Sequence, residues 1–309
     1  MLIESRYALF RGKIVPIEEA KVSVLAAVVN YGLAVFEGIR AYWVPEREEL
    51  LVFRLFDHVD RLRRNGRILF MDLPMPADEV AARAIELLTK EGIRGDAYIR
   101  PLLYKAAPEL GPHVHDSPCE LSMFATPLSR YANTADGLRA IVSSWRRTSD
   151  NAIPPRGKIA GSYVNAALAK SDAVLGGADE AILLTHDGAV SEGTVSNLFL
   201  VRDGQLVTPP VTAGILEGIT RRTVLTLARD LGFDVLERTV ERSELYVADE
   251  IFLCGTAMEL APVIEVDHRP VGDGVPGALT RRMAKEFDDV VHGRCPRHAD
   301  WCTAVIVRR

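Results

Sequence analysis

Lysine and cysteine are both scarce in this chain. Seven lysines stand against thirty arginines among 309 residues, so a primary amine is a rare group here. The four cysteines, Cys119, Cys254, Cys295 and Cys302, form no Cys-x-x-Cys pair and are too few and scattered for a disulfide framework, so we expect free thiols. A zinc site built from Cys295, His298 and Cys302 would match no standard spacing, and we expect no metal.

Long apolar runs and an excess of basic charge are also absent. The chain has no stretch of about 18 uncharged apolar residues and no basic-then-apolar leader at its N-terminus. The formal net charge of -5 argues against the basic footprint of a nucleic-acid binder. We therefore expect a soluble cytoplasmic protein that binds neither a membrane nor nucleic acid.

A polar stretch divides the chain. Residues 128–137 are mostly polar, which predicts an interdomain loop, and the length suggests two domains. We expect a small α/β domain over 1–127 and a larger mixed domain over 138–309. Strand-forming runs and helical periodicities alternate without an internal repeat, so the predicted fold class is α+β, or mixed α/β.

Local patterns place the main elements. Strand formers predict strands over residues 51–55, 97–104, 138–145, 181–185, 198–201 and 250–254. Apolar residues at helical spacing predict helices over residues 77–90, 162–175 and 220–231, and a further helix begins near residue 57.

Lys158 has the most suggestive setting of the few lysines. It follows Pro154-Pro155-Arg156-Gly157, a stiff and then pliant loop, and it precedes a predicted helix. An amine that condenses with an aldehyde must be partly deprotonated, and lysine is the side chain that burial tunes for this purpose. A solvated surface lysine is the alternative.

Glu192 stands before Gly193 in a polar turn that leads into an apolar strand. A carboxylate in such a turn is suited to pair with a protonated ring nitrogen. A hairpin glutamate in water is the alternative.

Three segments offer donors to a phosphate group. Gly218-Ile219-Thr220 opens a predicted helix, and Gly255-Thr256 follows a buried strand. Backbone N–H groups and a hydroxyl at a helix N-terminus form a phosphate site, although a plain N-cap explains Thr220 equally well. Arg61 adds a charge-assisted donor, with a solvated basic face as the alternative.

Two further features surround these segments. His58 precedes Arg61 on the same predicted helix, and we expect it to be a capping or surface residue. Tyr31 and Phe36 flank a glycine-framed turn that either walls an apolar pocket or forms a plain core hairpin.

Taken in order, these segments resemble the branched-chain aminotransferases of the fold type IV pyridoxal phosphate enzymes. The resemblance covers almost the whole chain. The segments that carry it are residues 31–40, 58–62, 98–101, 144–145, 158–163, 191–199, 217–221, 245–250 and 255–257.

The resemblance implies pyridoxal 5'-phosphate as cofactor, bound where the small and large domains meet. Lys158 would be the Schiff-base lysine and the proton carrier, Glu192 would face the pyridine nitrogen, and Tyr163 would bind the phenolic oxygen. The residues implied for the phosphate are Arg61, Gly218, Ile219, Thr220 and Thr256.

The resemblance also implies how substrates bind. Tyr98 and the backbone of Thr256 and Ala257 would hold the α-carboxylate. Arg100, with Tyr31 from a neighbouring subunit, would meet the side-chain carboxylate of glutamate, while Phe36 would line the apolar part of the pocket. The implied activity is transamination between leucine, isoleucine or valine and 2-oxoglutarate, by a homodimer at least.

The match departs from the family pattern near the pocket. The family's proline-tryptophan-glycine run is replaced at 127–131, the loop at 108–113 differs after its glycine, and Ser196 stands where a glutamate is familiar. D-amino acid aminotransferases, (R)-amine transaminases and aminodeoxychorismate lyase use an equivalent lysine and glutamate, so these activities stay open. A non-catalytic relative is a further alternative, which retention of Lys158, Glu192, Arg61 and Tyr163 opposes.

Overall fold

The computed structural model describes residues 4–108, 110–128 and 136–307, which divide into two compact units. Unit 1 comprises Met1–Ser129, Gly157–Gly161 and Asp289–Arg309, and unit 2 comprises Arg130–Arg156 and Ser162–Asp288. This division differs from the expected ranges 1–127 and 138–309 in two segments, 157–161 and 289–309, because both pair with strands of unit 1. Residues 129–135 of the expected interdomain loop lie outside the described residues.

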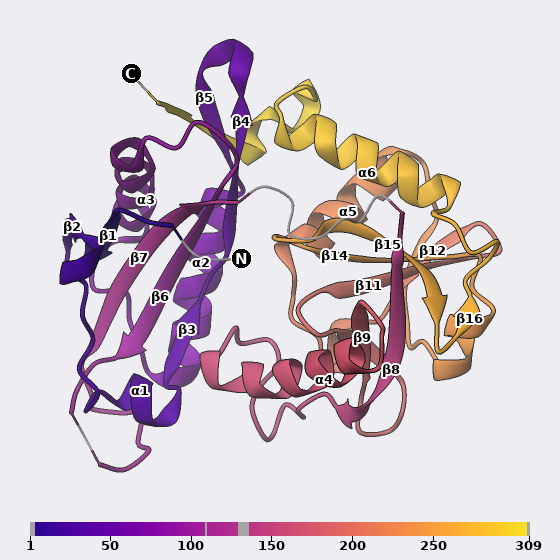
Figure 1. The fold of residues 1–309 in the computed structure, drawn as a ribbon, viewed down its shortest axis with the longest axis horizontal. Coiled ribbons are helices and arrows are strands. Elements are labelled where there is room, and N and C mark those ends of the chain that lie inside the picture. The colour runs from indigo at the N-terminus through magenta and orange to yellow at the C-terminus, as the bar shows by residue number, and fades with distance from the viewer. Residues whose placement is uncertain (1–3, 109, 129–135, 308–309) are drawn as a thin grey trace. The chain divides into compact units, whose positions relative to one another are not determined.

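Unit 1 is built on an antiparallel sheet with the strand order β17-β5-β4-β6-β7-β1-β2, with β3 paired beside β6 (Figure 1). Its strands are β1 (Tyr7–Phe10), β2 (Lys13–Pro16), β3 (Ala34–Phe36), β4 (Ile39–Val44), β5 (Glu49–Phe53), β6 (Ala97–Lys105), β7 (Cys119–Pro127) and β17 (Cys302–Ile306). Its helices are α1 (Ala27–Tyr31), α2 (Leu55–Gly66) and α3 (Ala77–Glu91).

The amphipathic pattern of α3 explains its position. Val80, Ala84, Leu87 and Leu88 recur at helical spacing and are buried, and the helix packs against β1 and β7. Gly92, with a φ of 65°, ends it in the left-handed conformation that glycine adopts without strain. The predicted helix over 77–90 is confirmed.

Unit 2 contains a mixed sheet with the order β10-β9-β8-β15-β14-β11-β12-β13, and β16 pairs with β15. Its strands are β8 (Leu138–Arg146), β9 (Glu180–Leu184), β10 (Val190–Gly193), β11 (Asn197–Arg202), β12 (Gln205–Thr208), β13 (Val235–Glu237), β14 (Glu250–Gly255), β15 (Glu259–Val266) and β16 (Arg269–Pro270). Its helices are α4 (Tyr163–Leu175) and α5 (Ile219–Asp230), while α6 (Ala278–Val291) crosses the division between the units. Leu198, Leu200, Ile251, Leu253 and Val263 are part of its buried core.

Short 3₁₀ helices complete the two units. They are η1 (Ile17–Glu19), η2 (Pro45–Arg47), η3 (Arg67–Leu69), η4 (Ala160–Ser162), η5 (Val211–Ala213), η6 (Arg242–Tyr246) and η7 (Pro296–Trp301).

The other predicted elements are confirmed to within one or two residues at each end, and two of the shifted boundaries have a clear cause. The strand predicted over 51–55 ends at Phe53, because Arg54 adopts a φ of 54° and Leu55 already begins α2. The helix predicted from residue 162 begins at Tyr163 after the turn η4. The mixture of helices and sheets confirms the α+β fold class.

Candidate active site

Lys158 lies in the short segment Gly157–Gly161, which belongs to unit 1, although the segments that flank it along the chain belong to unit 2. The Phe36 N–H donates to the Lys158 carbonyl oxygen at 3.0 Å, and Val35 and Ile159 form an antiparallel bridge. A Cβ on Gly32 would lie 3.0 Å from the Gly161 Cα, so the two backbones approach as closely as glycine permits. The Lys158 segment is thus attached to the end of β3.

An aromatic ring lies beside the Lys158 amine. The centre of the Phe36 ring is 5.0 Å from Lys158 Nζ and 4.6 Å from the guanidinium carbon of Arg100. Arg100 Nη2 donates to the Tyr98 hydroxyl at 2.7 Å, and its Nε donates to the same oxygen at 3.1 Å. Unit 1 therefore brings together four of the predicted site residues, Phe36, Tyr98, Arg100 and Lys158.

Arg61 is buried on α2, whereas Arg63 and Arg64 of the same helix are about half exposed. Arg61 donates through Nε and Nη2 to the two carboxylate oxygens of Glu37, at 2.7 and 2.8 Å. It is therefore not part of the solvated basic face.

His58 also contacts Glu37, with its Nδ1 2.7 Å from Glu37 Oε2. The expectation of a capping or surface histidine is wrong, because this side chain is 1% exposed and makes no cap. Sequence reasoning missed Glu37, since its partners follow it by 21 and 24 residues along the chain.

Tyr31 ends α1 and is 37% exposed. Its hydroxyl accepts a hydrogen bond from the Gly111 N–H at 3.1 Å. Glu109 and residues 129–131, where the sequence departs from the family pattern, lie outside the described residues, while Leu128 is buried.

Glu192 is held in unit 2 at the end of β10. Its Oε1 lies 2.8 Å from Arg147 Nη2, and its Oε2 accepts from Asn197 Nδ2 at 2.9 Å and from the Leu216 N–H at 3.1 Å. The carboxylate is 5% exposed and the Arg147 side chain 10%. Sequence reasoning gave Asn197 no role, although it lies in the segment 191–199 that carried the resemblance. It also missed Arg147, which lies two residues beyond the segment 144–145.

The N-terminus of α5 lies next to this carboxylate. Gly218 is the N-cap, so Ile219 and Thr220 carry N–H groups in the first helical turn, where no preceding turn supplies an acceptor. A Cβ on Gly218 would lie 2.0 Å from Asn197 Oδ1, and Asn197 is itself a partner of Glu192. Asn197 therefore contacts both the Glu192 carboxylate and the N-terminal end of α5, and a helix N-terminus favours anions.

Thr256 and Ala257 follow the end of β14. In the sheet Asn197 lies opposite Cys254, and a Cβ on Gly255 would lie 3.3 Å from the Val195 carbonyl oxygen. The turn that carries Thr256 thus lies beside the segment that ends at Asn197. Tyr163, the first residue of α4, is half-buried.

Comparison with known proteins identifies the family. The amino-transferase class IV pattern matches residues 34–266. The chain belongs to the class IV aminotransferases. Class IV aminotransferases are enzymes that depend on pyridoxal phosphate, so the predicted cofactor and enzyme class are confirmed.

Three relatives show how far this likeness extends. A probable branched-chain-amino-acid aminotransferase of Aquifex aeolicus is 46% identical over 300 residues, which cover 97% of this chain and 96% of that protein. The branched-chain aminotransferase of Thermoproteus uzoniensis with norvaline matches with a TM-score of 0.94 and 42% identity over 98% of this chain and all of that one. The branched-chain amino acid aminotransferase of Thermobaculum terrenum in its holo-form matches with a TM-score of 0.93 and 39% identity, over 98% and 99% of the two chains. The predicted fold type IV architecture is therefore confirmed.

The donor sets of the two units fit this cofactor. Pyridoxal phosphate needs an amine for its aldehyde, an acid for its ring nitrogen and donors for its phosphate. Unit 1 contains an amine and a guanidinium, those of Lys158 and Arg61. Unit 2 contains the Glu192 carboxylate and the glycine-capped N-terminus of α5, where a Cβ on Gly218 would clash with Asn197 Oδ1.

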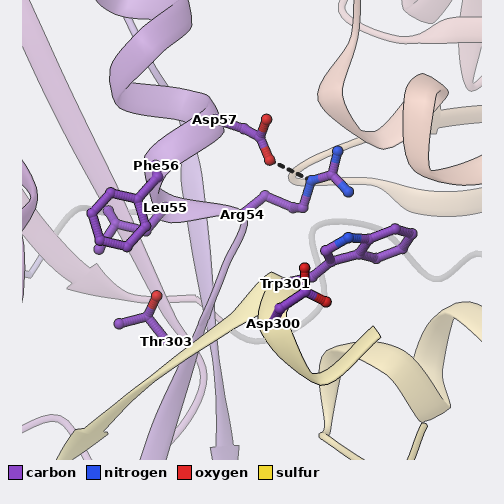
Figure 2. Close-up of a pocket in the computed structure, with 7 residues that line it drawn as sticks. All are labelled: Arg54, Leu55, Phe56, Asp57, Asp300, Trp301 and Thr303. Carbon is purple, nitrogen blue, oxygen red and sulfur yellow. Dashed lines mark ion pairs between the residues drawn. The ribbon is translucent and has the colours of Figure 1, made fainter. Parts of the chain in front are cut away.

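Neither of two cavities is lined by a residue predicted as a site residue. One of about 280 Å³ in unit 1 holds Arg54, whose Nε lies 2.6 Å from Asp57 and whose guanidinium carbon lies 4.4 Å from the centre of the Trp301 ring (Figure 2). Arg54 thus ties the start of α2 to the segment before β17. The other, of about 320 Å³ in unit 2, is lined by Arg147 together with residues of the loops around Asp150, His186 and Thr212.

The described ranges hold neither a membrane-spanning helix nor a metal-binding cluster. Among those residues, no helix is both long and apolar enough to cross a membrane. In the same ranges, no three His, Cys, Asp or Glu side chains are grouped to hold a metal ion.

Proposed function

We propose that this aminotransferase moves the amino group between the branched-chain L-amino acids leucine, isoleucine and valine and 2-oxoglutarate, giving branched 2-oxo acids and L-glutamate. The observation that carries the proposal is the Phe36 ring, whose centre lies 5.0 Å from the Lys158 amine and 4.6 Å from the Arg100 guanidinium carbon. An aliphatic side chain packs on the ring, whereas the side-chain carboxylate of glutamate pairs with Arg100. The names of the three relatives support branched-chain amino acids as substrates.

The cofactor supplies an electron-withdrawing ring when it is bound. Lys158 Nζ would hold the cofactor through its aldehyde, and as a free amine it would move a proton between the substrate Cα and the cofactor C4' atom. The Glu192 carboxylate would hold a proton at the ring nitrogen, and the Tyr163 hydroxyl would donate to the phenolic oxygen.

The remaining predicted residues would hold the phosphate and the substrate. The phosphate would accept from the Arg61 guanidinium, from the Ile219 and Thr220 N–H groups next to Gly218, and from the Thr256 hydroxyl. The α-carboxylate would bind Tyr98 and the backbone N–H groups of Thr256 and Ala257.

We also propose a homodimer. Val24, Leu25 and Val29 of unit 1 are 76%, 64% and 55% exposed, and apolar side chains gathered at a surface mark protein interfaces. Tyr31 follows these residues and would reach the site of the neighbouring subunit, where it would assist Arg100. The four cysteines are free thiols, which suits a reducing compartment, and we place the enzyme in the cytoplasm.

A half-reaction screen tests the substrate assignment. The cofactor-loaded enzyme is mixed separately with L-leucine, L-glutamate, D-alanine and (R)-1-phenylethylamine, and the absorbance of the cofactor is followed. Conversion by L-leucine and L-glutamate is expected. Faster conversion by D-alanine or by (R)-1-phenylethylamine would move the enzyme to the D-amino acid or (R)-amine transaminases.

Lys158→Ala is the matched variant for this screen. It removes the covalent attachment and the proton carrier together, so transamination should be abolished while the fold persists. Substantial turnover by the variant with cofactor bound would contradict the role of Lys158.

A further inference from the structure

Glu37 lies at the centre of a buried polar cluster in unit 1. Its side chain has no exposed surface, and those of His58 and Arg61 are 1% and 8% exposed. Glu37 Oε2 accepts from His58 Nδ1 and Arg61 Nη2, and Oε1 accepts from Arg61 Nε, all within 2.8 Å. The roles proposed above use only Arg61 of these three residues.

The protonation states within the cluster follow from its contacts. Burial alone would raise the pKa of Glu37, but the charge and hydrogen bonds of Arg61 and the hydrogen bond of His58 outweigh burial and hold that pKa below its ordinary value. Burial lowers the pKa of His58, and the positive charges of Arg61 and Lys158 lower it further, against the opposing effect of Glu37. A charged carboxylate only accepts, so the neutral His58 carries its proton on Nδ1.

The cluster is attached to the strand end that also holds the Lys158 segment. The Glu37 N–H donates to the Pro101 carbonyl oxygen of β6 at 2.9 Å, and the preceding Phe36 N–H donates to the Lys158 carbonyl oxygen. Two consecutive residues therefore fix the Lys158 backbone and the Arg61 guanidinium within the same unit.

Stability alone does not account for this arrangement. A buried ion pair often contributes no more stability than well-packed apolar side chains of similar volume. A carboxylate that binds a guanidinium through both of its oxygens, however, fixes the plane of that guanidinium. It thereby fixes the directions of the guanidinium N–H groups that remain for other acceptors.

We propose that Glu37 and His58 are positioning residues for the cofactor phosphate and act through Arg61. Glu37 fixes the guanidinium, and the His58 N–H fixes Glu37. The inference rests on the proposed role of Arg61 as a phosphate ligand.

A positioning role and net charge alone predict opposite effects of Glu37→Gln on phosphate binding. Glu37 cancels the charge of Arg61, so removing the carboxylate charge would strengthen phosphate binding if only net charge mattered. If orientation matters, Glu37→Gln weakens phosphate binding, because the NH₂ group of the glutamine must then face an N–H donor of His58 or Arg61, and two donors cannot form a hydrogen bond.

The test measures cofactor binding to the apoenzyme, by absorbance and fluorescence titration with pyridoxal phosphate and, separately, with pyridoxal, which lacks the phosphate. We expect Glu37→Gln and His58→Leu to weaken pyridoxal phosphate binding on the order of 10-fold to 100-fold, the effect of one charge-assisted hydrogen bond. Pyridoxal binding should change less than about 2-fold, because it reports the amine and ring contacts alone.

Two controls accompany these variants. His58→Asn keeps an N–H donor near the position of Nδ1 and should restore most of the affinity that His58→Leu loses. Glu91→Gln changes another buried carboxylate of unit 1, which accepts from the N–H groups of Arg6 and Tyr7, and should leave both affinities unchanged.

A double-mutant cycle identifies Arg61 as the intermediary. Glu37→Gln should add little to the loss already caused by Arg61→Leu. Equal losses for pyridoxal phosphate and pyridoxal, or additive losses in the cycle, would overturn the inference and leave Glu37 with a structural role. Unchanged binding of pyridoxal phosphate by Arg61→Leu would instead overturn the proposed role of Arg61 itself.

Discussion

Replacing Glu192 by glutamine should separate the structural role of this carboxylate from its chemical role. The carboxylate uses both oxygens as acceptors, Oε1 toward Arg147 and Oε2 toward Asn197 and the Leu216 N–H. A glutamine has a single side-chain oxygen. Its NH₂ group must therefore face either Arg147 or the pair of donors on the other side.

The size of the effect follows from burial. Because Arg147 and Glu192 are 10% and 5% exposed, Glu192→Gln leaves a nearly buried guanidinium without its counter-charge. Removing one partner of a buried ion pair costs about 3–5 kcal/mol. Replacing both partners by neutral or apolar groups costs much less, so Arg147→Met added to Glu192→Gln should restore most of the lost stability.

Urea unfolding of the apoproteins measures this difference. Trp145 lies in unit 2, whereas Trp43 and Trp301 lie in unit 1, so hydrogen exchange on β10 and β11 peptides should accompany tryptophan fluorescence and assign the change to unit 2. The double variant should be nearly as stable as the parent yet remain at least about 100-fold less active, because its ring-nitrogen partner is neutral.

Two results would refute this reasoning. A loss of less than about 1 kcal/mol for Glu192→Gln would mean that the ion pair is solvated. A further loss on adding Arg147→Met, in place of restored stability, would mean that Arg147 packs the core independently of Glu192.

Three further predictions concern unit 1. Arg100→Leu should raise KM for glutamate and 2-oxoglutarate by roughly 10-fold or more while affecting leucine little; equal changes for all three would contradict the assignment. Gly38→Ala should cost about 1–3 kcal/mol in thermal unfolding, because the new Cβ would lie too close to the Tyr98 hydroxyl. Tyr98→Phe removes that oxygen, so Gly38→Ala should cost less in a Tyr98→Phe background. Additive losses of stability for the two substitutions would count against the clash. Because the pKa of His58 is lowered from 6.5 on folding, the unfolded state takes up the proton first, and His58 contributes stability that is lost as pH falls below 6.5. In His58→Asn, the free energy of unfolding should therefore fall less steeply than in the parent protein as pH drops below 6.5. Identical slopes for the two proteins would contradict this prediction.

The sequence predicts those parts of the site that depend on short-range pattern. Lys158 stands out because two prolines and a glycine precede it, and Gly218 stands out because a glycine before a periodic apolar stretch begins a helix. Both features are complete within a few residues, so periodicity and turn chemistry suffice to find them.

The contacts between distant segments could not be predicted in this way. Whether Arg61 is solvated or buried depends on Glu37, and the expectation for His58 was wrong for the same reason. The pairing of β17 with β5 joins segments from near opposite ends of the chain, and no local pattern records it. Long-range hydrogen bonds of this kind belong to the tertiary structure, and a single sequence carries no direct trace of them.

The three-segment composition of unit 1 has a consequence for synthesis on the ribosome. Domains usually fold in the order in which they emerge, but β17 at the edge of the unit 1 sheet is made only after all of unit 2. Unit 2 is also interrupted, by the short segment Gly157–Gly161. Until Cys302–Ile306 emerges, β5 presents an unpaired edge, so nascent chains stalled before residue 302 should be the species most prone to aggregate.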